Sequence, residues 1–162
     1  MVKMARERFG ASQLISPEDL RLCREAVEAA QRAYAPYSKF AVGAAIRTVD
    51  GKTFAGANLE NAVYGLSICA EMAALTNLNF NGDLRGIDAV AVAGYSLNQD
   101  TVSGHIVTPC GRCRQLISEF AGLAHRNVPI FCCNADLSQI AVYRIEELLP
   151  HAFGPRNIGQ GT

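Results

Sequence analysis

Three cysteines and a glutamate form the most informative pattern in this chain of 162 residues. Cys69 stands two positions before Glu71 in the stretch SICAEMAAL. Further along, Cys110 and Cys113 form a Cys-x-x-Cys pair in TPCGRCRQ. Two cysteines at this spacing can ligate one metal ion, and a catalytic zinc takes three protein ligands and keeps a fourth position for water. The sequence therefore predicts a zinc site with Cys69, Cys110 and Cys113 as its ligands.

Glu71 is expected to act on a substrate and not on the metal. Zinc deaminases of nucleobases share a His or Cys followed by x-Glu and, at a distance, by Pro-Cys-x-x-Cys, and their glutamate carries protons without ligating zinc. Pro109 directly before Cys110 completes this pattern. Each half alone is a weak signal, but the two together strongly favour zinc-dependent removal of an amino group.

Other interpretations of these residues stay open at this point. Cys110 and Cys113 could form a redox pair, because Cys-x-x-Cys at a helix start is also typical of disulfide oxidoreductases. Cys69 and Glu71 would then have no role. Alternatively, His105 could be the fourth ligand of a closed structural zinc site.

The remaining cysteines and histidines are assigned to ordinary positions. Cys23 lies on the apolar stripe of an expected helix and is predicted to be buried. Cys132 and Cys133 are neighbours on an expected strand, so they should face opposite sides of a sheet and pack separately. His125 and His151 are expected at the surface.

Strands and helices alternate along the elements that must position the site. The predicted elements are a helix from Ser16 to Ala35, a hairpin with strands Phe40 to Ile46 and Thr53 to Ala55, a helix from about Cys69 to Phe80, a strand from Ile87 to Ala93, a helix from Gly111 to about Ala124, a strand from Val128 to Cys133, a short strand from Ile140 to Val142, and a short helix from Glu146 to Leu149. This order favours an α/β fold, a three-layer α/β/α sandwich with a mixed sheet.

Both halves of the cysteine pattern fall at expected helix N-termini, whose partial positive charge lowers the pKa of a thiol. If the strands at residues 87–93 and 128–133 run parallel beside the first strand, these N-termini meet at one edge of the sheet. Cys69, Cys110 and Cys113 would then come together.

Composition limits the class of partner. Lys plus Arg and Asp plus Glu number 15 each, so no net charge attracts the chain to nucleic acid or to an anionic membrane, and a small molecule is the expected partner. No apolar stretch is long enough to span a membrane, and the N-terminus lacks the apolar core of a secretory signal, so a cytoplasmic protein is expected. We expect an N-terminal arm at residues 1–15, one catalytic domain at 16–155 and a tail at 156–162.

The motifs resemble those of the homotetrameric, zinc-dependent cytidine deaminases of pyrimidine salvage. The resemblance runs from Ser16 to Pro155 through PYSKFAVGAAI, GANLENAVYGLSICAE, PCGRCRQ and ELLPHAFGP. It implies a five-stranded mixed sheet, one Zn²⁺ per chain, and hydrolysis of cytidine and 2'-deoxycytidine to the uridine forms with release of ammonia. A deaminase of a modified cytosine nucleoside or of an aminoacylnucleoside antibiotic is the alternative, and a zinc-stabilised binding module, which would not need Glu71, is a further one.

The resemblance also implies roles for single residues. Glu71 would pass a proton to N3 of the pyrimidine and later to the leaving amine. Asn58 and Glu60 would hold the ribose hydroxyls, which an amide and a carboxylate can satisfy. The other implied contacts are Phe40 beside the pyrimidine, the backbone amide of Ala70 on the base, Ala62 and Tyr64 across the subunit interface, and Phe153 lent by a neighbouring subunit.

Met72 departs from the family pattern, in which an arginine usually follows Cys-Ala-Glu. Three thiolates outweigh the charge of Zn²⁺, so a nearby cation is expected to offset the excess negative charge. Arg114 is the expected charge-tuning residue, helped by the two helix N-termini, and Arg112 is a further candidate. Met72 is then expected to pack against the core or a neighbouring subunit, unless it is a change that the site merely tolerates.

Overall fold

The computed structural model describes residues 15–98 and 105–159. Nearly all of the predicted N-terminal arm, the end of the tail and part of the loop between residues 94 and 108 therefore lie outside the described residues. The helices and strands are α1 (Pro17–Ala30), β1 (Phe40–Thr48), β2 (Thr53–Ala57), η1 (Tyr64–Leu66), α2 (Ala70–Asn81), η2 (Leu84–Gly86), β3 (Ile87–Ser96), α3 (Gly111–Leu123), β4 (Pro129–Asn134), β5 (Ile140–Arg144), α4 (Ile145–Leu148) and η3 (Pro155–Ile158).

The five strands form one mixed sheet in the order β2-β1-β3-β4-β5. β1 is antiparallel to both of its neighbours, β3 and β4 are parallel, and β5 is antiparallel to β4. The expectation that residues 87–93 and 128–133 run parallel beside the first strand is wrong. β3 is antiparallel to β1, and β4 is parallel to β3 and lies between β3 and β5. The helix N-termini nevertheless meet, since β2 and β3 are both antiparallel to β1 and so end at the same edge.

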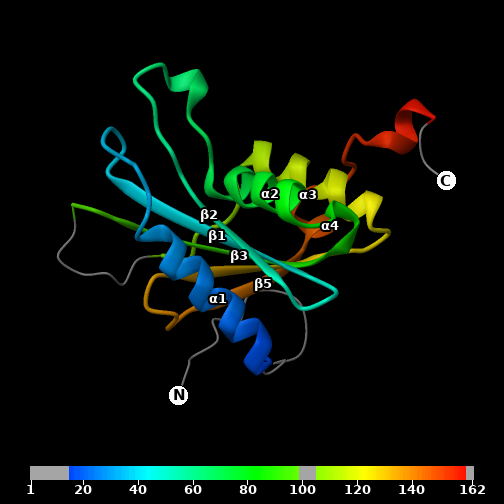
Figure 1. Ribbon diagram of the computed structural model, residues 1–162, viewed down its shortest axis with the longest axis horizontal. Coiled ribbons are helices and arrows are strands. Elements are labelled where there is room, and N and C mark those ends of the chain that lie inside the picture. The colour runs from blue at the N-terminus through cyan, green and yellow to red at the C-terminus, as the bar shows by residue number, and fades with distance from the viewer. Residues whose placement is uncertain (1–14, 99–104, 160–162) are drawn as a thin grey trace.

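Helices cover both faces of the sheet, as Figure 1 shows, so the expected three-layer sandwich is confirmed. α1 lies on one face, and α2 and α3 lie on the other. Gly43 allows α1 to approach β1 closely, because a Cβ atom there would overlap the backbone of Ala26 and Ala30. The assignment of Cys132 and Cys133 to packing is confirmed, since they are buried in separate clusters on opposite faces. Cys23 is buried in the α1 cluster, also as predicted.

α1 begins where the sequence predicts, with the Ser16 hydroxyl accepting a hydrogen bond from the Asp19 amide at 3.1 Å. It ends at Ala30, before the predicted end at Ala35. Tyr34, expected on the buried stripe, is 54% exposed, and its backbone pairs instead with the segment after β2. Continued apolar spacing suggested a longer helix, but these long-range backbone hydrogen bonds end it.

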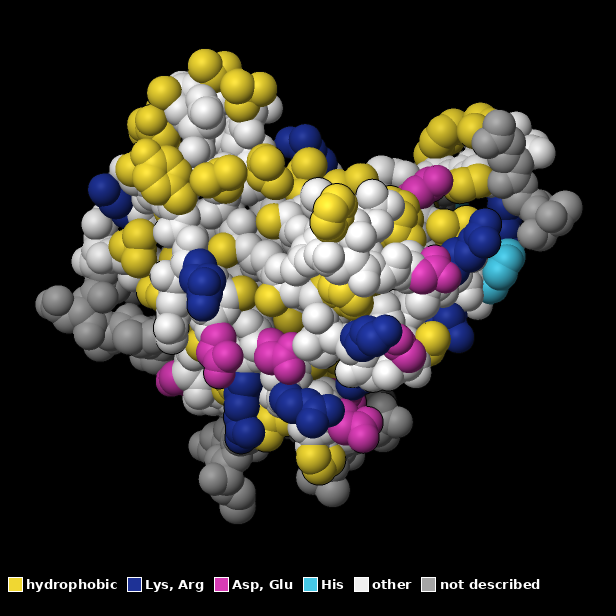
Figure 2. All heavy atoms as spheres, viewed as in Figure 1, with side chains coloured by type: hydrophobic (Ala, Val, Ile, Leu, Met, Phe, Trp, Pro, Cys, Tyr) yellow, Lys and Arg dark blue, Asp and Glu magenta, His cyan; other side chains and the backbone are white. Residues whose placement is uncertain are grey.

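The loop between β2 and α2, residues 58–69, protrudes from the body of the molecule (Figure 1). Figure 2 shows hydrophobic side chains gathered over this protruding loop. The exposed residues that form the patch are Leu59, Val63, Tyr64 and Leu66. Within the described ranges, no helix is both long and apolar enough to cross a membrane.

Candidate metal centre

The three predicted ligands come together at the N-termini of α2 and α3. Cys69 and Cys110 are the N-cap residues of these helices, and both have extended backbone angles. Neither side chain makes a capping hydrogen bond, so both sulfur atoms are available for another partner. Cys113 is buried in the first turn of α3. Two helix N-termini therefore point their partial positive charges at one group of thiols.

The Sγ atoms of Cys69, Cys110 and Cys113, here called the three-sulfur group, lie within 4.8 Å of one another. The Sγ atoms of Cys69 and Cys110 are 3.9 Å apart. Zn–S bonds of about 2.3 Å in tetrahedral geometry place two sulfurs about 3.8 Å apart, so the donors and their spacing fit Zn²⁺. His105 is exposed and outside this group, and all six cysteines are free. Among the described residues, this group offers three protein ligands, and a catalytic zinc with three protein ligands keeps its fourth position for water.

The pKa values of two thiols in the three-sulfur group, Cys69 and Cys113, move in opposite directions. Cys113 donates a hydrogen bond to Cys69, which lowers the pKa of Cys69 to about 6 and raises that of Cys113. The charge of Arg112 also lowers the Cys69 pKa, although burial and the nearby Glu71 oppose this effect. Thiolates are the form that binds zinc, so the lowered pKa favours Cys69 as a ligand.

Glu71 lies beside the group without belonging to it. Its side chain is only 4% exposed, and this burial raises the pKa of its carboxyl group. Hydrogen bonds from its own backbone and from Cys113 act in the opposite direction. A buried carboxyl group with a raised pKa next to a metal site can both accept and return a proton.

The sequence model of a known family, the cytidine and deoxycytidylate deaminase zinc-binding region, matches residues 16–131. This chain belongs to that family. Its cofactor is Zn²⁺, and the three-sulfur group fits this ion.

Similar deaminases extend the match over most of the chain. A cytidine deaminase of Halalkalibacterium halodurans is 42% identical over 132 residues, covering 82% of this chain and 91% of that protein. A cytidine deaminase of Mycobacterium tuberculosis is 38% identical over 133 residues, covering 80% and 84%. The crystal structure of cytidine deaminase from Burkholderia pseudomallei matches with a TM-score of 0.69 and 37% identity, covering 83% of this chain and 98% of that one.

Arg114 of this family member holds the loop that carries Cys110. Its guanidinium donates to the carbonyl oxygen of Pro109 at 2.8 Å, to that of Leu148 at 3.1 Å and to the Thr108 hydroxyl at 3.4 Å. These hydrogen bonds give Arg114 a structural role that the sequence did not suggest. Met72, which stands where the family usually has an arginine, is half-buried in the first turn of α2.

Asn58 and Glu60, predicted to hold the ribose, both bind the backbone at the start of β1. The Asn58 amide accepts from the backbone N–H of Val42 at 2.8 Å and donates to the carbonyl oxygen of Phe40 at 2.9 Å. Glu60 accepts from the amides of Tyr37 and Ser38 at 2.9 and 3.2 Å. Hydrogen bonding with Ser38 is the main reason why the pKa of Glu60 lies below its usual value. Phe40, Asn58 and Glu60 therefore lie close together.

The other predicted contact residues lie on separate segments. Ala70 is buried at the first position of α2, so its amide belongs to the helix N-terminus. Tyr64 is 74% exposed on the protruding loop, close to Tyr37 with ring centres 5.8 Å apart, and Ala62 is exposed on the same loop. Phe153 is 64% exposed on the segment that follows α4. Figure 1 shows this segment on the other side of the view from the protruding loop.

Sequence reasoning assigned no role to Gln115, although it was quoted within PCGRCRQ. Its amide Nε2 donates a hydrogen bond to the carbonyl oxygen of Phe153 at 2.7 Å. The only available signal was its place in the same motif as Cys113 and Arg114, because nothing in a linear sequence pairs it with a residue near the C-terminus.

Proposed function

We propose that this protein is a zinc-dependent cytidine deaminase that converts cytidine and 2'-deoxycytidine to uridine and 2'-deoxyuridine with release of ammonia. The observation that carries the proposal is the buried Glu71 beside three thiols at two helix N-termini. The relatives named cytidine deaminase, which match most of the chain, support the same substrate. The corresponding role is pyrimidine salvage.

The reaction divides between a metal and a proton carrier. Cys69, Cys110 and Cys113 hold the ion through their thiolates. Bound Zn²⁺ supplies a Lewis acid that lowers the pKa of water at the open fourth position. Glu71 takes a proton from the attacking water and gives it to N3 of the cytosine ring. C4 gains the water oxygen as a hydroxyl group. Glu71 then takes the proton of this hydroxyl and gives it to the amine nitrogen, so that the C4–N bond breaks, C4=O forms and ammonia departs.

Substrate orientation is proposed to depend on the residues around the start of β1. Asn58 and Glu60 are held by backbone hydrogen bonds, and each keeps further hydrogen-bonding capacity for a ribose hydroxyl. Phe40 lies at the same place with a partly exposed ring that can pack beside the pyrimidine. The amide of Ala70 at the N-terminus of α2 contacts the base.

We further propose that the working enzyme is a homotetramer. A small substrate is usually enclosed over most of its surface, yet Tyr64 and Phe153 expose 74% and 64% of their surface in a single chain. The protruding loop adds a patch of exposed apolar side chains that neighbouring subunits would cover (Figure 2). In this arrangement Ala62, Tyr64 and Phe153 contact the site of a neighbour.

A cytoplasmic location belongs to the same proposal. Thiols persist as metal ligands in a reducing compartment, and all six cysteines of this chain are free.

The test uses purified full-length protein whose zinc content per chain is measured. Cytidine, 2'-deoxycytidine, free cytosine and modified cytosine nucleosides are offered, and the change in pyrimidine absorbance is followed. We expect turnover of the two plain nucleosides and not of free cytosine, which lacks the sugar. Zinc-loaded protein that turns over no cytosine nucleoside would overturn the proposal, and turnover of modified nucleosides alone would move it to the alternative substrate class.

Glu71→Gln is the matched variant for this assay. Because an amide cannot carry the proton, we expect a loss of kcat of about 10² to 10⁴-fold with zinc retained. Glu28→Gln, an exposed change on α1, is the control and should leave activity unchanged. Full activity of Glu71→Gln would exclude Glu71 as the proton carrier.

A further inference from the structure

The segment after α4, residues 149–155, is attached to α3 by side chains that follow directly on a predicted zinc ligand. Arg114, next to Cys113, donates at 3.1 Å to the carbonyl oxygen of Leu148, the last residue of α4 and the one directly before the segment. Gln115 donates to the carbonyl oxygen of Phe153 at 2.7 Å. α3, which carries one predicted zinc ligand and is capped by another, is therefore bonded to the chain directly before this segment and again at Phe153.

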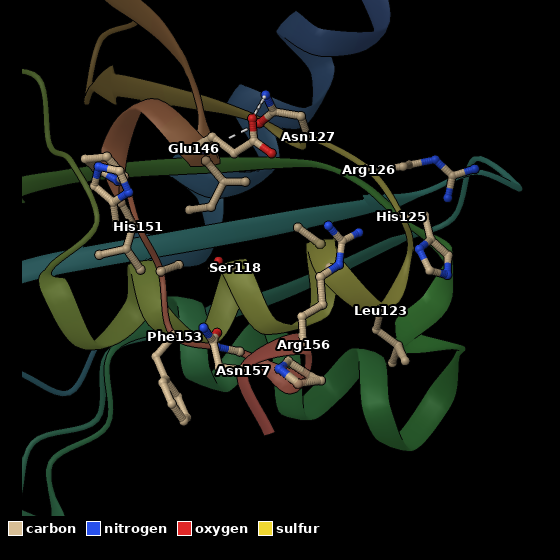
Figure 3. A pocket seen from close by; sticks show the side chains of 18 of the residues that line it. Ser118, Leu123, His125, Arg126, Asn127, Glu146, His151, Phe153, Arg156 and Asn157 are labelled. Carbon is tan, nitrogen blue, oxygen red and sulfur yellow. Dashed lines mark hydrogen bonds between the residues drawn. The ribbon is translucent and has the colours of Figure 1, made fainter. Parts of the chain in front are cut away.

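A cavity of about 850 Å³ separates the segment from the body of the molecule. Its lining includes Ser118, Glu146, His151 and Arg156, contributed by α3, α4 and the chain beyond them (Figure 3). Because of this cavity, continuous apolar packing does not fix the segment along its length. Among the hydrogen bonds that Arg114 and Gln115 make, the one from Gln115 to Phe153 is the shortest, at 2.7 Å.

The peptide group between Phe153 and Gly154 is bound through both of its polar atoms. Its carbonyl oxygen accepts from Gln115, and its N–H donates to the Asn157 side chain at 2.8 Å. Hydrogen bonds on opposite sides of a planar peptide fix the direction of that plane. The ring of Phe153 leaves the chain beside this plane and points away from Glu146 and Asn127 (Figure 3). Gln115 therefore sets the direction in which an exposed aromatic side chain is presented.

Gln115 and Cys113 lie on opposite sides of α3. At about 100° per residue, side chains two positions apart on α3 point in nearly opposite directions. Cys113 points into the three-sulfur group, so Gln115 points to the other side of the helix. Gln115 therefore holds the backbone of Phe153 on the side of α3 away from Cys113, and the exposed ring is accessible to a second copy of the chain.

We propose that Gln115 is a positioning residue that holds Phe153 in the orientation in which it completes the substrate site of a neighbouring copy. The hydrogen bonds of Gln115 and Asn157 with the peptide group of Phe153 and Gly154 support the positioning of Phe153. The claim that Phe153 then contacts a substrate rests on the proposed function. Gln115 touches neither zinc nor nucleoside. It acts through the carbonyl oxygen of Phe153.

The first test measures order in the segment and needs no activity. Hydrogen exchange followed by mass spectrometry reports the amides of the peptide that contains Gly154. Gln115→Leu removes the donor at similar size, and Gln115→Glu replaces it by a carboxylate that repels the carbonyl oxygen. We expect exchange of that peptide to accelerate about tenfold in both variants, and not in the control Gln31→Leu, an exposed change just after α1. Unchanged exchange in both variants would overturn the positioning role.

The second test is a double-mutant cycle with Phe153→Ala, read as KM for cytidine at measured zinc content. Gln115→Leu should raise KM about tenfold while zinc per chain stays unchanged. If Gln115 acts through Phe153, adding Gln115→Leu to Phe153→Ala should raise KM no further. Additive effects on KM, or loss of zinc, would overturn the proposal in favour of a separate role for Gln115. A wild-type protein without turnover would refute the proposed function, and with it the claim that Phe153 completes the substrate site of a neighbour. Hydrogen exchange would still decide whether Gln115 positions Phe153.

Discussion

Arg114 shows how one side chain near the metal centre can have two separable roles. The sequence suggested that its positive charge offsets three thiolates, because Met72 leaves the usual arginine position without a cation. The geometry adds hydrogen bonds to Pro109, Leu148 and Thr108, which hold the loop that carries Cys110. Meanwhile, the arginine whose charge lowers the Cys69 pKa is Arg112. The charge-tuning role of Arg114 therefore stays a proposal with a specific rival.

Arg114→Ala is expected to weaken zinc retention about 10- to 100-fold, because the ligand loop loses its supporting hydrogen bonds and a nearby charge. The measurement is zinc remaining per chain after titration with a chelator, together with kcat for cytidine. Arg112→Ala, in the same helical turn, is the matched comparison and should have the smaller effect. An effect of Arg112→Ala equal to or larger than that of Arg114→Ala would transfer the charge-tuning role to Arg112.

Between elements, the contact of α1 with β1 depends on the absence of a side chain at Gly43. A methyl group there would overlap the backbone of Ala26 and Ala30, which cannot move without shifting the whole helix. We expect Gly43→Ala to lower the free energy of unfolding by about 3 kcal/mol. Urea denaturation followed by circular dichroism would measure it.

Gly122→Ala in α3 is the control for Gly43→Ala. Nothing lies within 4 Å of a Cβ atom at Gly122, so the same change should be neutral or stabilise the helix by up to about 1 kcal/mol. Equal stability of the Gly43 and Gly122 variants would show that α1 can move away from the sheet without cost.

At the scale of the whole molecule, zinc links the two helices whose N-termini carry its ligands. An ion that binds the folded chain and not the unfolded one adds about 2.7 kcal/mol of stability when its free concentration is 100 times its Kd. We therefore expect a chelator to lower the midpoint of thermal unfolding of the wild-type protein. Cys110→Ala should already have the lower midpoint and respond little to the chelator. A midpoint of the wild type that is independent of chelator would contradict zinc as a stabilising ligand.

Assembly is the second property at this scale. Leu66→Asp places a charge in the exposed apolar patch of the protruding loop and should dissociate the proposed tetramer, because burying an unpaired charge at an interface is costly. Sedimentation equilibrium gives the mass of the assembly. Val49→Asp, equally apolar and exposed but in the hairpin turn at the opposite end of β2, should leave the mass unchanged. An intact assembly of Leu66→Asp would place the interface elsewhere.

Local sequence determined most of the metal chemistry. The Cys-x-x-Cys spacing and the position of Cys69 at a helix start follow from residues a few positions apart, and helix caps depend on such neighbours. The same holds for the Ser16 cap and the turn between β1 and β2. The α/β class followed from the order of these local patterns, so the three-layer fold could be predicted before any contact was known.

Tertiary structure decided what depends on distant partners. It placed the sulfurs of Cys69 and Cys110, which are 41 positions apart, 3.9 Å from each other. The antiparallel pairing of β1 with β3, which contributes to this placement, was not predicted from the sequence. Pairing with the segment after β2 ended α1 at Ala30 despite an apolar period that continued to Tyr34. The burial of Glu71 and the hydrogen bond from Gln115 to Phe153, 38 positions away, also depend on distant segments of the chain. A residue's type and its neighbours fix its chemistry and local backbone, but burial and long-range pairing depend on which distant segments the folded chain brings together.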